Sequence, residues 1–195
     1  MTDKPTQPAK AEILRALYRA VDWSRLYELL PGVTREQVDA LFAELRETVG
    51  GAPSPDVDVS GGAVDVYCDG ASRGNPGPAG LGVVVRTPDG REVAAWGDRL
   101  GRATNNVAEY MACIAGLRRT RELGAQAVRV LSDSELLVRQ ITGRYRVRNA
   151  ALQPLHAQVM DLLGSFESWE AVHIPREQNT QADRLATQAA KRAKR

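Results

Sequence analysis

The hydrophobic pattern changes character at a Gly/Pro/Ser-rich segment, and this change constrains the fold more than any other sequence feature. Apolar side chains recur at helical spacing over residues 9–49, whereas short apolar runs and two-residue alternation begin at residue 63. Residues 50–62, between these parts, have no apolar period, as expected of a linker. We therefore predict a small helical domain over 1–49, a linker over 50–62 and a larger domain over 63–195.

The larger domain shows strand and helix patterns in the order βββαβααβα. Strands are expected at 63–68, 79–86, 92–98, 127–132 and 169–174, and helices at about 105–122, 134–141, 150–163 and 179–190. The sequence T-P-D-G-R at 87–91 predicts a hairpin turn. Because a strand, helix, strand succession favours a parallel crossover, we expect an α/β fold with a mixed five-stranded sheet flanked by helices.

The N-terminal part is predicted to form a small all-α domain of three short helices. The first covers about 13–21 and the second about 26–30, and Thr34 and Gln37 have the spacing of a capping box at the start of a third. Its aromatic side chains stand where a small helical core would use them, namely Tyr18, Trp23, Tyr27 and Phe42.

The net charge of +2 is an average over two parts of opposite sign. Residues 1–60 carry seven basic and ten acidic side chains, and residues 61–195 carry 19 and 14. The basic excess of the larger domain would attract a polyanion, whereas the acidic N-terminal part is a poor electrostatic match for nucleic acid. For that part we expect contact with a protein partner or self-association.

Composition excludes several classes of protein. Hydrophobic residues make up 43% and charged residues 26%, which excludes a collagen-like chain, disorder throughout and a small disulfide scaffold. No apolar run approaches the roughly 18 residues of a membrane span, and the first ten residues lack the apolar stretch of a signal peptide. Cys68 and Cys113 form no metal-type cluster. We expect a cytoplasmic protein without membrane contact.

Four acidic residues stand at or near the ends of predicted elements. Asp69 ends the first strand, Glu109 lies in the first turns of its helix, Asp133 follows the fourth strand and Asp183 lies in the last helix. Each residue taken singly has a simpler explanation. Asp69 fits an Asp-Gly turn, and Glu109 fits a favourable charge near a helix start. Asp133 fits a helix N-cap, and Asp183 fits a solvated surface charge.

The predicted sheet brings these carboxylates together. Strands one and four would be parallel neighbours, so Asp69 and Asp133 would leave them side by side. Glu109 shares a helix face with the small residues Cys113 and Gly116, which would let that helix lie close on the sheet. Crowded carboxylates repel one another unless a cation binds between them, and an all-oxygen set favours Mg²⁺ or Mn²⁺. Two such ions about 4 Å apart suit in-line attack on a phosphodiester.

Residues 63 to about 190 resemble ribonuclease H type 1, the ribonuclease HI family. The resemblance rests on four motifs in order, D-G-A-S-R-G-N-P-G-P-A-G, T-N-N-V-A-E-Y, S-D-S-E-L-L-V-R-Q and R-E-Q-N-T-Q-A-D-R-L-A. It implies a ribonuclease H-like fold and cleavage of the RNA strand of RNA/DNA hybrids, giving 5′-phosphate and 3′-hydroxyl ends. It also implies that Asp69, Glu109, Asp133 and Asp183 are the catalytic ligands of two Mg²⁺ ions, with Mn²⁺ as the alternative. Asp69 would touch both ions, with Glu109 and Asp133 on one side and Asp183 on the other.

Amide side chains are candidates for sensing the RNA 2′-hydroxyl, which both donates and accepts hydrogen bonds. The resemblance implies that Asn75 and Asn105 meet 2′-hydroxyls, and that Thr104 and Asn106 hold a phosphate of the DNA strand. Helix capping is the alternative role for Thr104 and Asn105. Ser134 is expected to add a substrate contact.

A basic segment follows the short helix at 134–141. Four arginines surround Tyr145 there, namely Arg139, Arg144, Arg146 and Arg148. Arginine with an interleaved aromatic ring suits phosphates and sugars, so Arg144, Tyr145 and Arg146 are candidate substrate contacts. A solvated basic loop is the alternative.

The chain departs from many members of this family in lacking a histidine shortly before the last acidic residue. Between Pro175 and Asp183 it has none, and His173 falls inside the preceding predicted strand. Glu177 is the nearest titratable substitute, and we expect it to act as an auxiliary residue in metal or product exchange.

Two other functions remain open at this point. A catalytically silent module that binds hybrids is one, although intact identity at all four carboxylates argues against it. Cleavage of double-stranded RNA is the other, because its minor groove also presents 2′-hydroxyls.

Overall fold

A computed structural model of the chain describes residues 17, 21, 23–48 and 59–191. The chain divides into two compact units, Met1–Asp56 and Val57–Arg195. The first predicted helix of the N-terminal part falls outside the described residues, apart from Leu17 and Val21.

The N-terminal unit contains two described helices, α2 (Trp23–Leu29) and α3 (Arg35–Thr48). The predicted capping box at the start of α3 is confirmed. Thr34 N donates to Gln37 Oε1 at 2.9 Å, and Gln37 N donates to Thr34 Oγ1 at 3.2 Å. Tyr27 is 40% exposed, so the prediction that it packs in a core is wrong.

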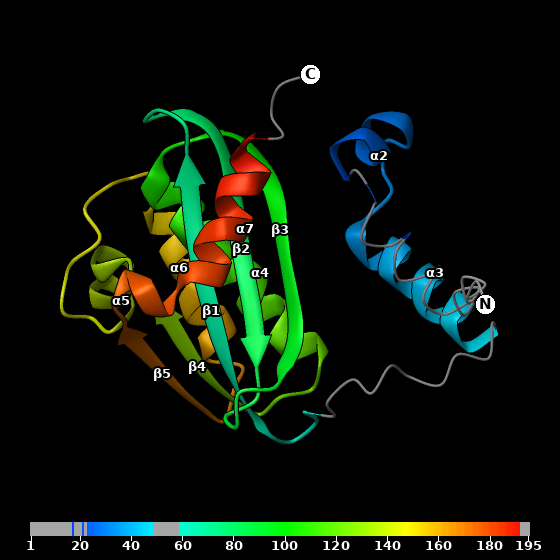
Figure 1. Cartoon of the computed structure of the whole chain (residues 1–195). Helices are drawn as coiled ribbons and strands as arrows, with labels where there is room; N and C mark the ends of the chain where they lie inside the picture. The colour runs from blue at the N-terminus through cyan, green and yellow to red at the C-terminus, as the bar shows by residue number, and fades with distance from the viewer. Residues whose placement is uncertain (1–16, 18–20, 22, 49–58, 192–195) are drawn as a thin grey trace, which may run out of the picture. The chain divides into compact units, whose positions relative to one another are not determined.

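The second unit is built on a five-stranded mixed sheet of order β3-β2-β1-β4-β5 (Figure 1). Its strands are β1 (Ala63–Ser72), β2 (Gly77–Arg86), β3 (Glu92–Ala103), β4 (Ala127–Ser132) and β5 (Ser168–His173). The first three strands pair antiparallel, whereas β1 with β4 and β4 with β5 pair parallel. The predicted α/β fold is confirmed, including the parallel contact between strands one and four.

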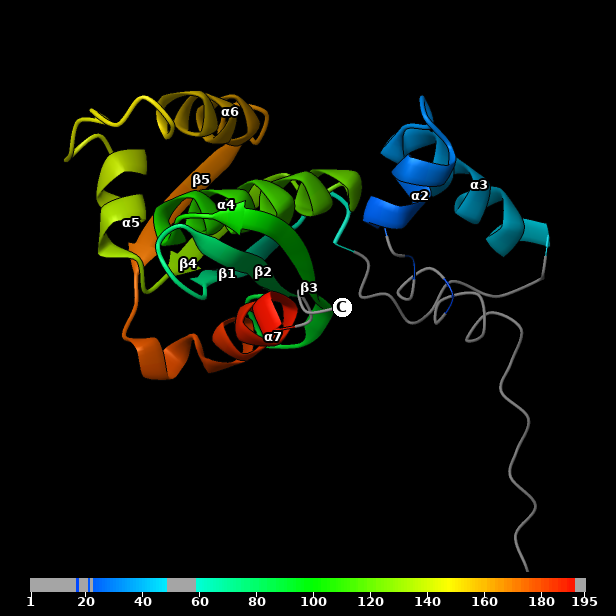
Figure 2. The same ribbon diagram turned by 90° about the horizontal axis from the view of Figure 1, so that it is seen from above.

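Helices cover both faces of the sheet (Figure 2). They are α4 (Asn105–Glu122), α5 (Glu135–Ile141), α6 (Gln153–Leu163), the single 3₁₀ turn η1 (Arg176–Gln178) and α7 (Thr180–Lys191). On one face α4 packs against β1 and β2 and carries α6 on its outer side, and on the other face α7 crosses β1, β2 and β3. Among the described residues, no helix combines the length and apolar character needed to cross a bilayer.

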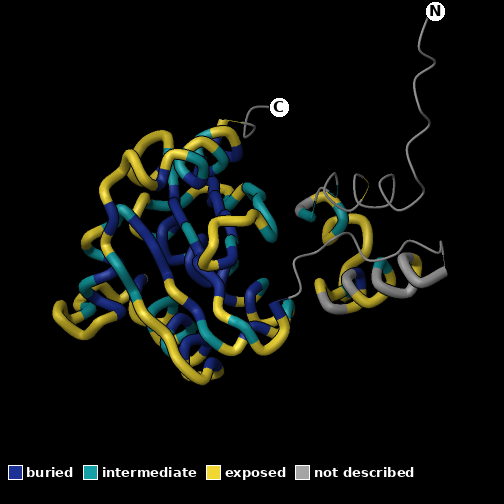
Figure 3. The backbone as a smooth tube through the Cα atoms, turned by 60° about the horizontal axis from the view of Figure 1, so that its bottom comes forward, coloured by how far each residue is buried: buried dark blue, intermediate teal, exposed yellow. Residues whose placement is uncertain are grey.

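The hydrophobic core lies between the sheet and α4. Side chains from alternate positions of β1, Val64 and Val66, are almost fully buried there, as are Tyr110, Ile114 and Leu117 of α4. Figure 3 shows the buried residues of this unit along its strands and the exposed residues along its loops. Because α4 is enclosed between the sheet and α6, its sequence is apolar on more than one side.

The first strand is longer than predicted, and this changes the place of Asp69. Pairing of β1 with β2 continues to Ser72, so Asp69 lies inside a strand rather than at its end. The parallel pairing of β1 with β4 stops earlier, at Tyr67 opposite Leu131. Asp69 therefore still lies just beyond the last β1–β4 pair, near the point where Asp133 follows β4.

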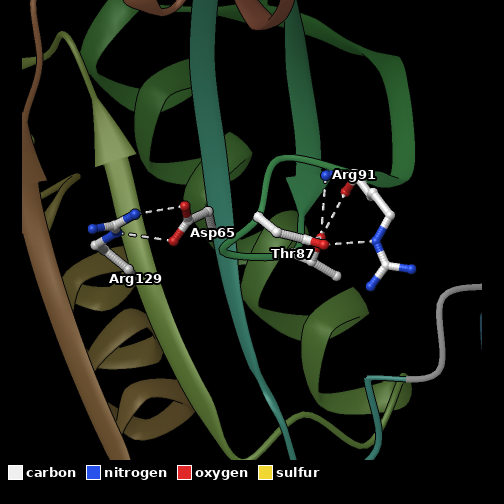
Figure 4. A network of polar contacts seen from close by, with 5 residues as sticks. Asp65, Thr87, Arg91 and Arg129 are labelled. Carbon is white, nitrogen blue, oxygen red and sulfur yellow. Dashed lines mark hydrogen bonds and ion pairs between the residues drawn. The ribbon is translucent and has the colours of Figure 1, made fainter.

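An ion pair fixes the register of β1 against β4 (Figure 4). Asp65 and Arg129 are directly opposite each other in the parallel pair. Arg129 donates to both carboxylate oxygens of Asp65, from Nε at 2.9 Å and from Nη2 at 2.6 Å. Asp65 is only 6% exposed, so this bidentate contact satisfies a carboxylate that would otherwise be buried without a partner.

The hairpin between β2 and β3 forms at the predicted turn. Thr87 Oγ1 accepts a hydrogen bond from Arg91 N at 3.2 Å (Figure 4). The same hydroxyl donates a hydrogen bond to the Asp89 carboxylate. Arg91 Nε in turn donates to Asp89 Oδ2 at 2.9 Å. These local contacts explain why the sequence signal for this turn is strong.

Glycine in β2 allows α7 to lie directly on the sheet. A Cβ atom at Gly82 would stand 2.1 Å from the carbonyl oxygen of Ala182, inside any van der Waals contact. This close approach sets the height of α7 above β1 and β2, and with it the position of Asp183.

We predict that Gly82→Ala lowers the free energy of unfolding by about 2 kcal/mol, because the added methyl must push α7 away from the sheet. Urea denaturation of the full chain measures this change. Gly164→Ala is the matched control, since a Cβ there meets nothing closer than 3.4 Å and the residue has helical φ. Equal stability of the two variants would contradict the proposed packing constraint.

Candidate active site

The site begins with a contact between β1 and the start of α4. A Cβ at Gly70 would lie 2.1 Å from the backbone nitrogen of Glu109, so only glycine allows the helix to come this close. Gly70 N donates to Glu109 Oε2 at 3.3 Å. Asp69 and Glu109 are 5% and 7% exposed. The glycine after Asp69 thus places two buried carboxylates side by side on neighbouring elements.

Asn179, which the sequence analysis did not select, holds the third carboxylate. Its Nδ2 donates to Asp133 Oδ1 at 2.6 Å and to the carbonyl oxygen of Cys68 at 3.0 Å. The backbone carbonyl of Asn179 accepts a hydrogen bond from Asp183 N at 3.0 Å in the first turn of α7. This side chain, only 1% exposed, therefore links β1, the end of β4 and the start of α7. A polar residue just before a helix is the usual sign of an N-cap and was the available signal.

Arg176, also not selected from the sequence, binds the fourth carboxylate. Its Nη2 donates to Asp183 Oδ1 in an ion pair between η1 and α7. The side chains of Arg176 and Asp183 are 71% and 28% exposed. Asp183 is therefore a paired charge at the rim of the site, rather than the isolated surface charge expected of it when taken alone.

The carboxylates lie within electrostatic reach of one another. Burial, followed by the charges of Asp133 and Asp183, raises the pKa of Asp69 to about 7. Burial, followed by Asp69 and Asp133, raises the pKa of Glu109 to about 9. The Arg176 charge and the Gly70 N–H act in the opposite direction on both groups.

The donor set fits a hard divalent cation. It consists of carboxylate oxygens, and the amide oxygen of Asn179 is buried beside them without a hydrogen-bond partner. As the side chains stand, no three Asp, Glu, His or Cys residues in the described part of the chain enclose an ion. A cation would relieve the repulsion that raises the pKa values of Asp69 and Glu109.

Amide and hydroxyl side chains surround the start of α4. Asn75 Oδ1 accepts from Asn105 N at 3.3 Å, and Asn105 Nδ2 donates to Glu109 Oε1 at 3.3 Å. Thr104 is the N-cap of α4, accepting from the backbone nitrogen of Val107 at 3.3 Å, so the capping alternative is confirmed for it. The Asn105 side chain instead contacts Glu109, and Asn75, Asn105 and Asn106 are all exposed.

Ser134 caps the next helix. Its Oγ accepts from Leu137 N at 3.4 Å at the start of α5. The capping role considered for Asp133 is therefore wrong, because the helix begins one residue later than that role requires. This leaves the Asp133 carboxylate for the site, where Asn179 holds it.

The arginine cluster is partly engaged within the protein. Arg139 pairs with Glu135 at 2.5 Å, donates to the Tyr145 hydroxyl at 2.6 Å and lies 4.8 Å from the centre of its ring. Tyr145 is nevertheless 44% exposed, and Arg144 and Arg146 are exposed beside it. A basic surface with one accessible ring thus follows α5.

The segment before α7 carries the residues considered in place of the family histidine. His173 is the last residue of β5 and is exposed. Glu177 is exposed in the middle of η1. Within η1, the residue that contacts a site carboxylate is Arg176, through Asp183.

Comparison with known proteins finds relatives in sequence and in structure. A family model described as reverse transcriptase-like matches residues 67–189. Ribonuclease HI of Halobacterium salinarum is 37% identical over 187 residues, which cover 94% of each chain. The crystal structure of RNase H1 from the same organism superposes with a TM-score of 0.66 and 43% identity, over 68% of this chain and 100% of that one. The crystal structure of LC11-RNase H1 in complex with an RNA/DNA hybrid superposes with a TM-score of 0.64 and 38% identity, over 67% of this chain and 98% of that one.

We predict that, with a chelator present, Glu109→Gln stabilises the protein relative to wild type increasingly as pH rises. The folded carboxyl, with pKa about 9, holds its proton to higher pH than an unfolded glutamate, with pKa about 4. The wild type therefore loses stability between these values, while the amide does not titrate. Urea midpoints at pH 5.5, 7 and 8.5 measure the difference.

The control for this pH series is Asp161→Asn, which removes an exposed carboxylate of α6. It should shift stability by a small amount that does not grow with pH. A constant difference between wild type and Glu109→Gln across the series would show that Glu109 is not held protonated by its surroundings.

Proposed function

The chain belongs to the ribonuclease HI family and is an endoribonuclease, and on this premise we propose that it hydrolyses the RNA strand of RNA/DNA hybrids by two-metal-ion catalysis. The products would be 5′-phosphate and 3′-hydroxyl ends. The observation that carries the proposal is the meeting of Asp69, Glu109, Asp133 and Asp183, from separate elements, at one end of the β1–β4 pair. The hybrid bound to LC11-RNase H1 supports this substrate class.

Two Mg²⁺ ions, or Mn²⁺ in their place, would be held by the four carboxylates. Asp69 would contact both ions, Glu109 and Asp133 one, and Asp183 the other. When bound, such ions activate a water molecule for in-line attack and stabilise the leaving oxygen.

The contribution of the protein itself would be to orient two of these carboxylates, Glu109 and Asp133, before substrate arrives. The Gly70 N–H orients Glu109, and the Asn179 amide orients Asp133 against the backbone of β1. Side chains held in this way need little reorganisation, which is the condition for efficient catalysis by charge.

Selection of the RNA strand would come from the amides at the start of α4. Asn75 and Asn105 are exposed next to Glu109 and offer both donors and acceptors to a 2′-hydroxyl. Thr104 and Asn106 would hold a phosphate of the DNA strand. Ser134 and the exposed group of Arg144, Tyr145 and Arg146 would contact the hybrid further along.

The helical unit would serve contact with a protein partner or self-association. Leu29, Leu30 and Leu41 are more than half exposed among its described residues. Exposed leucines of this kind are suited to protein contact rather than to a nucleic acid backbone.

We predict that the full chain with Mg²⁺ cleaves the RNA strand of a labelled hybrid and that Asp69→Asn reduces the rate by at least about a thousandfold, since it removes a central ligand. Asp161→Asn is the control and should cleave like wild type. Circular dichroism checks that both variants fold. A hybrid bound tightly but not cut would favour the binding-module alternative, and cutting of a duplex-RNA control would extend the substrate class.

We predict that Glu177→Gln changes turnover mainly at low Mg²⁺, because an exposed carboxylate in η1 would assist metal or product exchange. Cleavage rates over a Mg²⁺ titration measure this effect, with Gln178→Ala as a neighbouring control. Turnover equal to wild type at every Mg²⁺ concentration would refute the auxiliary role.

A further inference from the structure

Arg176 forms an ion pair with a carboxylate that the proposed function needs as a metal ligand. Its Nη2 donates to Asp183 Oδ1. A guanidinium and a divalent cation at the same carboxylate oxygen repel each other, so the ion pair with Arg176 weakens the binding of a metal ion at that oxygen. The contact therefore bears directly on how the site takes up its ions.

The influence of Arg176 extends beyond Asp183. Its charge lowers the pKa values of both Asp69 and Glu109, against the effects of burial and of their neighbours. The charges of Asp183, Asp133 and Asp69 in turn raise the pKa of the guanidinium. Arg176 thus compensates the negative charge of the cluster, as a cation in the site would.

The backbone around Arg176 is suited to a change of side-chain position without a change of fold. Ile174 is buried and its N–H donates to the carbonyl of Ser132 at 3.0 Å, and Asn179 is buried at the other end. Between these anchors η1 is a single turn with no buried residue. The Arg176 side chain is 71% exposed, so it can leave Asp183 into solvent at little cost in packing.

We propose that Arg176 is an internal counter-ion that competes with a divalent cation for Asp183, and that the cation releases its guanidinium to contact the phosphate backbone of the bound nucleic acid. The inference rests on the proposed function. Arg176 is in this sense a positioning residue, because it acts on metal uptake through Asp183. A guanidinium released beside the site faces the polyanion, the ligand to which arginine binds best.

The decisive experiment is calorimetric titration of the full chain with Mn²⁺ in the absence of nucleic acid. We expect Arg176→Gln to bind Mn²⁺ about tenfold more tightly than wild type, which corresponds to about 1.4 kcal/mol. Arg176→Lys, which keeps the charge, should remain close to wild type. Arg184→Gln is the matched control, since it removes an exposed arginine that follows Asp183 directly in the sequence.

A double-mutant cycle locates the competition at Asp183. In an Asp183→Asn background, Arg176→Gln should change Mn²⁺ affinity by less than about twofold, because the shared oxygen is no longer a charged ligand. A tenfold effect that persists in this background would refute competition at Asp183.

Steady-state kinetics test the second half of the proposal. At saturating Mg²⁺, Arg176→Gln should raise the KM for a hybrid by about tenfold while kcat changes by less than about threefold, since a phosphate contact is lost. A loss confined to kcat would overturn the release of Arg176 toward the substrate.

The outcomes separate this inference from the proposed function. Equal Mn²⁺ affinities of wild type and Arg176→Gln would overturn the counter-ion role and leave the metal site intact. If wild type binds no Mn²⁺ at millimolar concentration, the metal-dependent function fails, and the inference fails with it.

Discussion

The site depends on the contact between β1 and the first turn of α4, where there is no room for a side chain on Gly70. Any Cβ at that position would fall 2.1 Å from the backbone nitrogen of Glu109. The same glycine supplies the N–H that binds the Glu109 carboxylate. One small residue therefore sets both the distance between two elements and the orientation of a ligand. The Asp65–Arg129 pair extends this control to β4, because it fixes the register that places Asp133 near Asp69.

Crowding of carboxylates has an energetic cost, and the protein offsets it with a different device for each of three carboxylates. Glu109 accepts a backbone N–H, Asp133 accepts the Asn179 amide, and Asp183 accepts the Arg176 guanidinium. Asp69, at the centre, has the Gly70 N–H and the Arg176 charge near enough to lower its pKa, but burial and the charges of Asp133 and Asp183 raise it further, to about 7. The repulsion that remains is what a divalent cation in the site would relieve.

Local patterns predicted most of the fold, and contacts distant in sequence account for what they missed. The bounds of α4 and β4 follow from apolar periodicity and from capping by Thr104, which are local properties, and both were predicted correctly. The extension of β1 past Asp69 depends on pairing with β2, which a glycine-rich sequence conceals. Asn179 contacts Cys68 and Asp133, which lie 111 and 46 positions away in the sequence, so its role could not be predicted from its sequence neighbours.

The segment between Pro175 and Asp183 carries Arg176 and no histidine, and this determines how its charge depends on pH. A histidine near the site would lose its charge within the physiological pH range, whereas Arg176 stays protonated, and its acidic neighbours raise its pKa further. Loss of a proton from the guanidinium therefore does not break its pair with Asp183 in that pH range, whereas another cation at Asp183 competes with it. On the proposal made above, the exposed turn η1 would respond to the concentration of divalent metal through Asp183, the carboxylate that Arg176 binds.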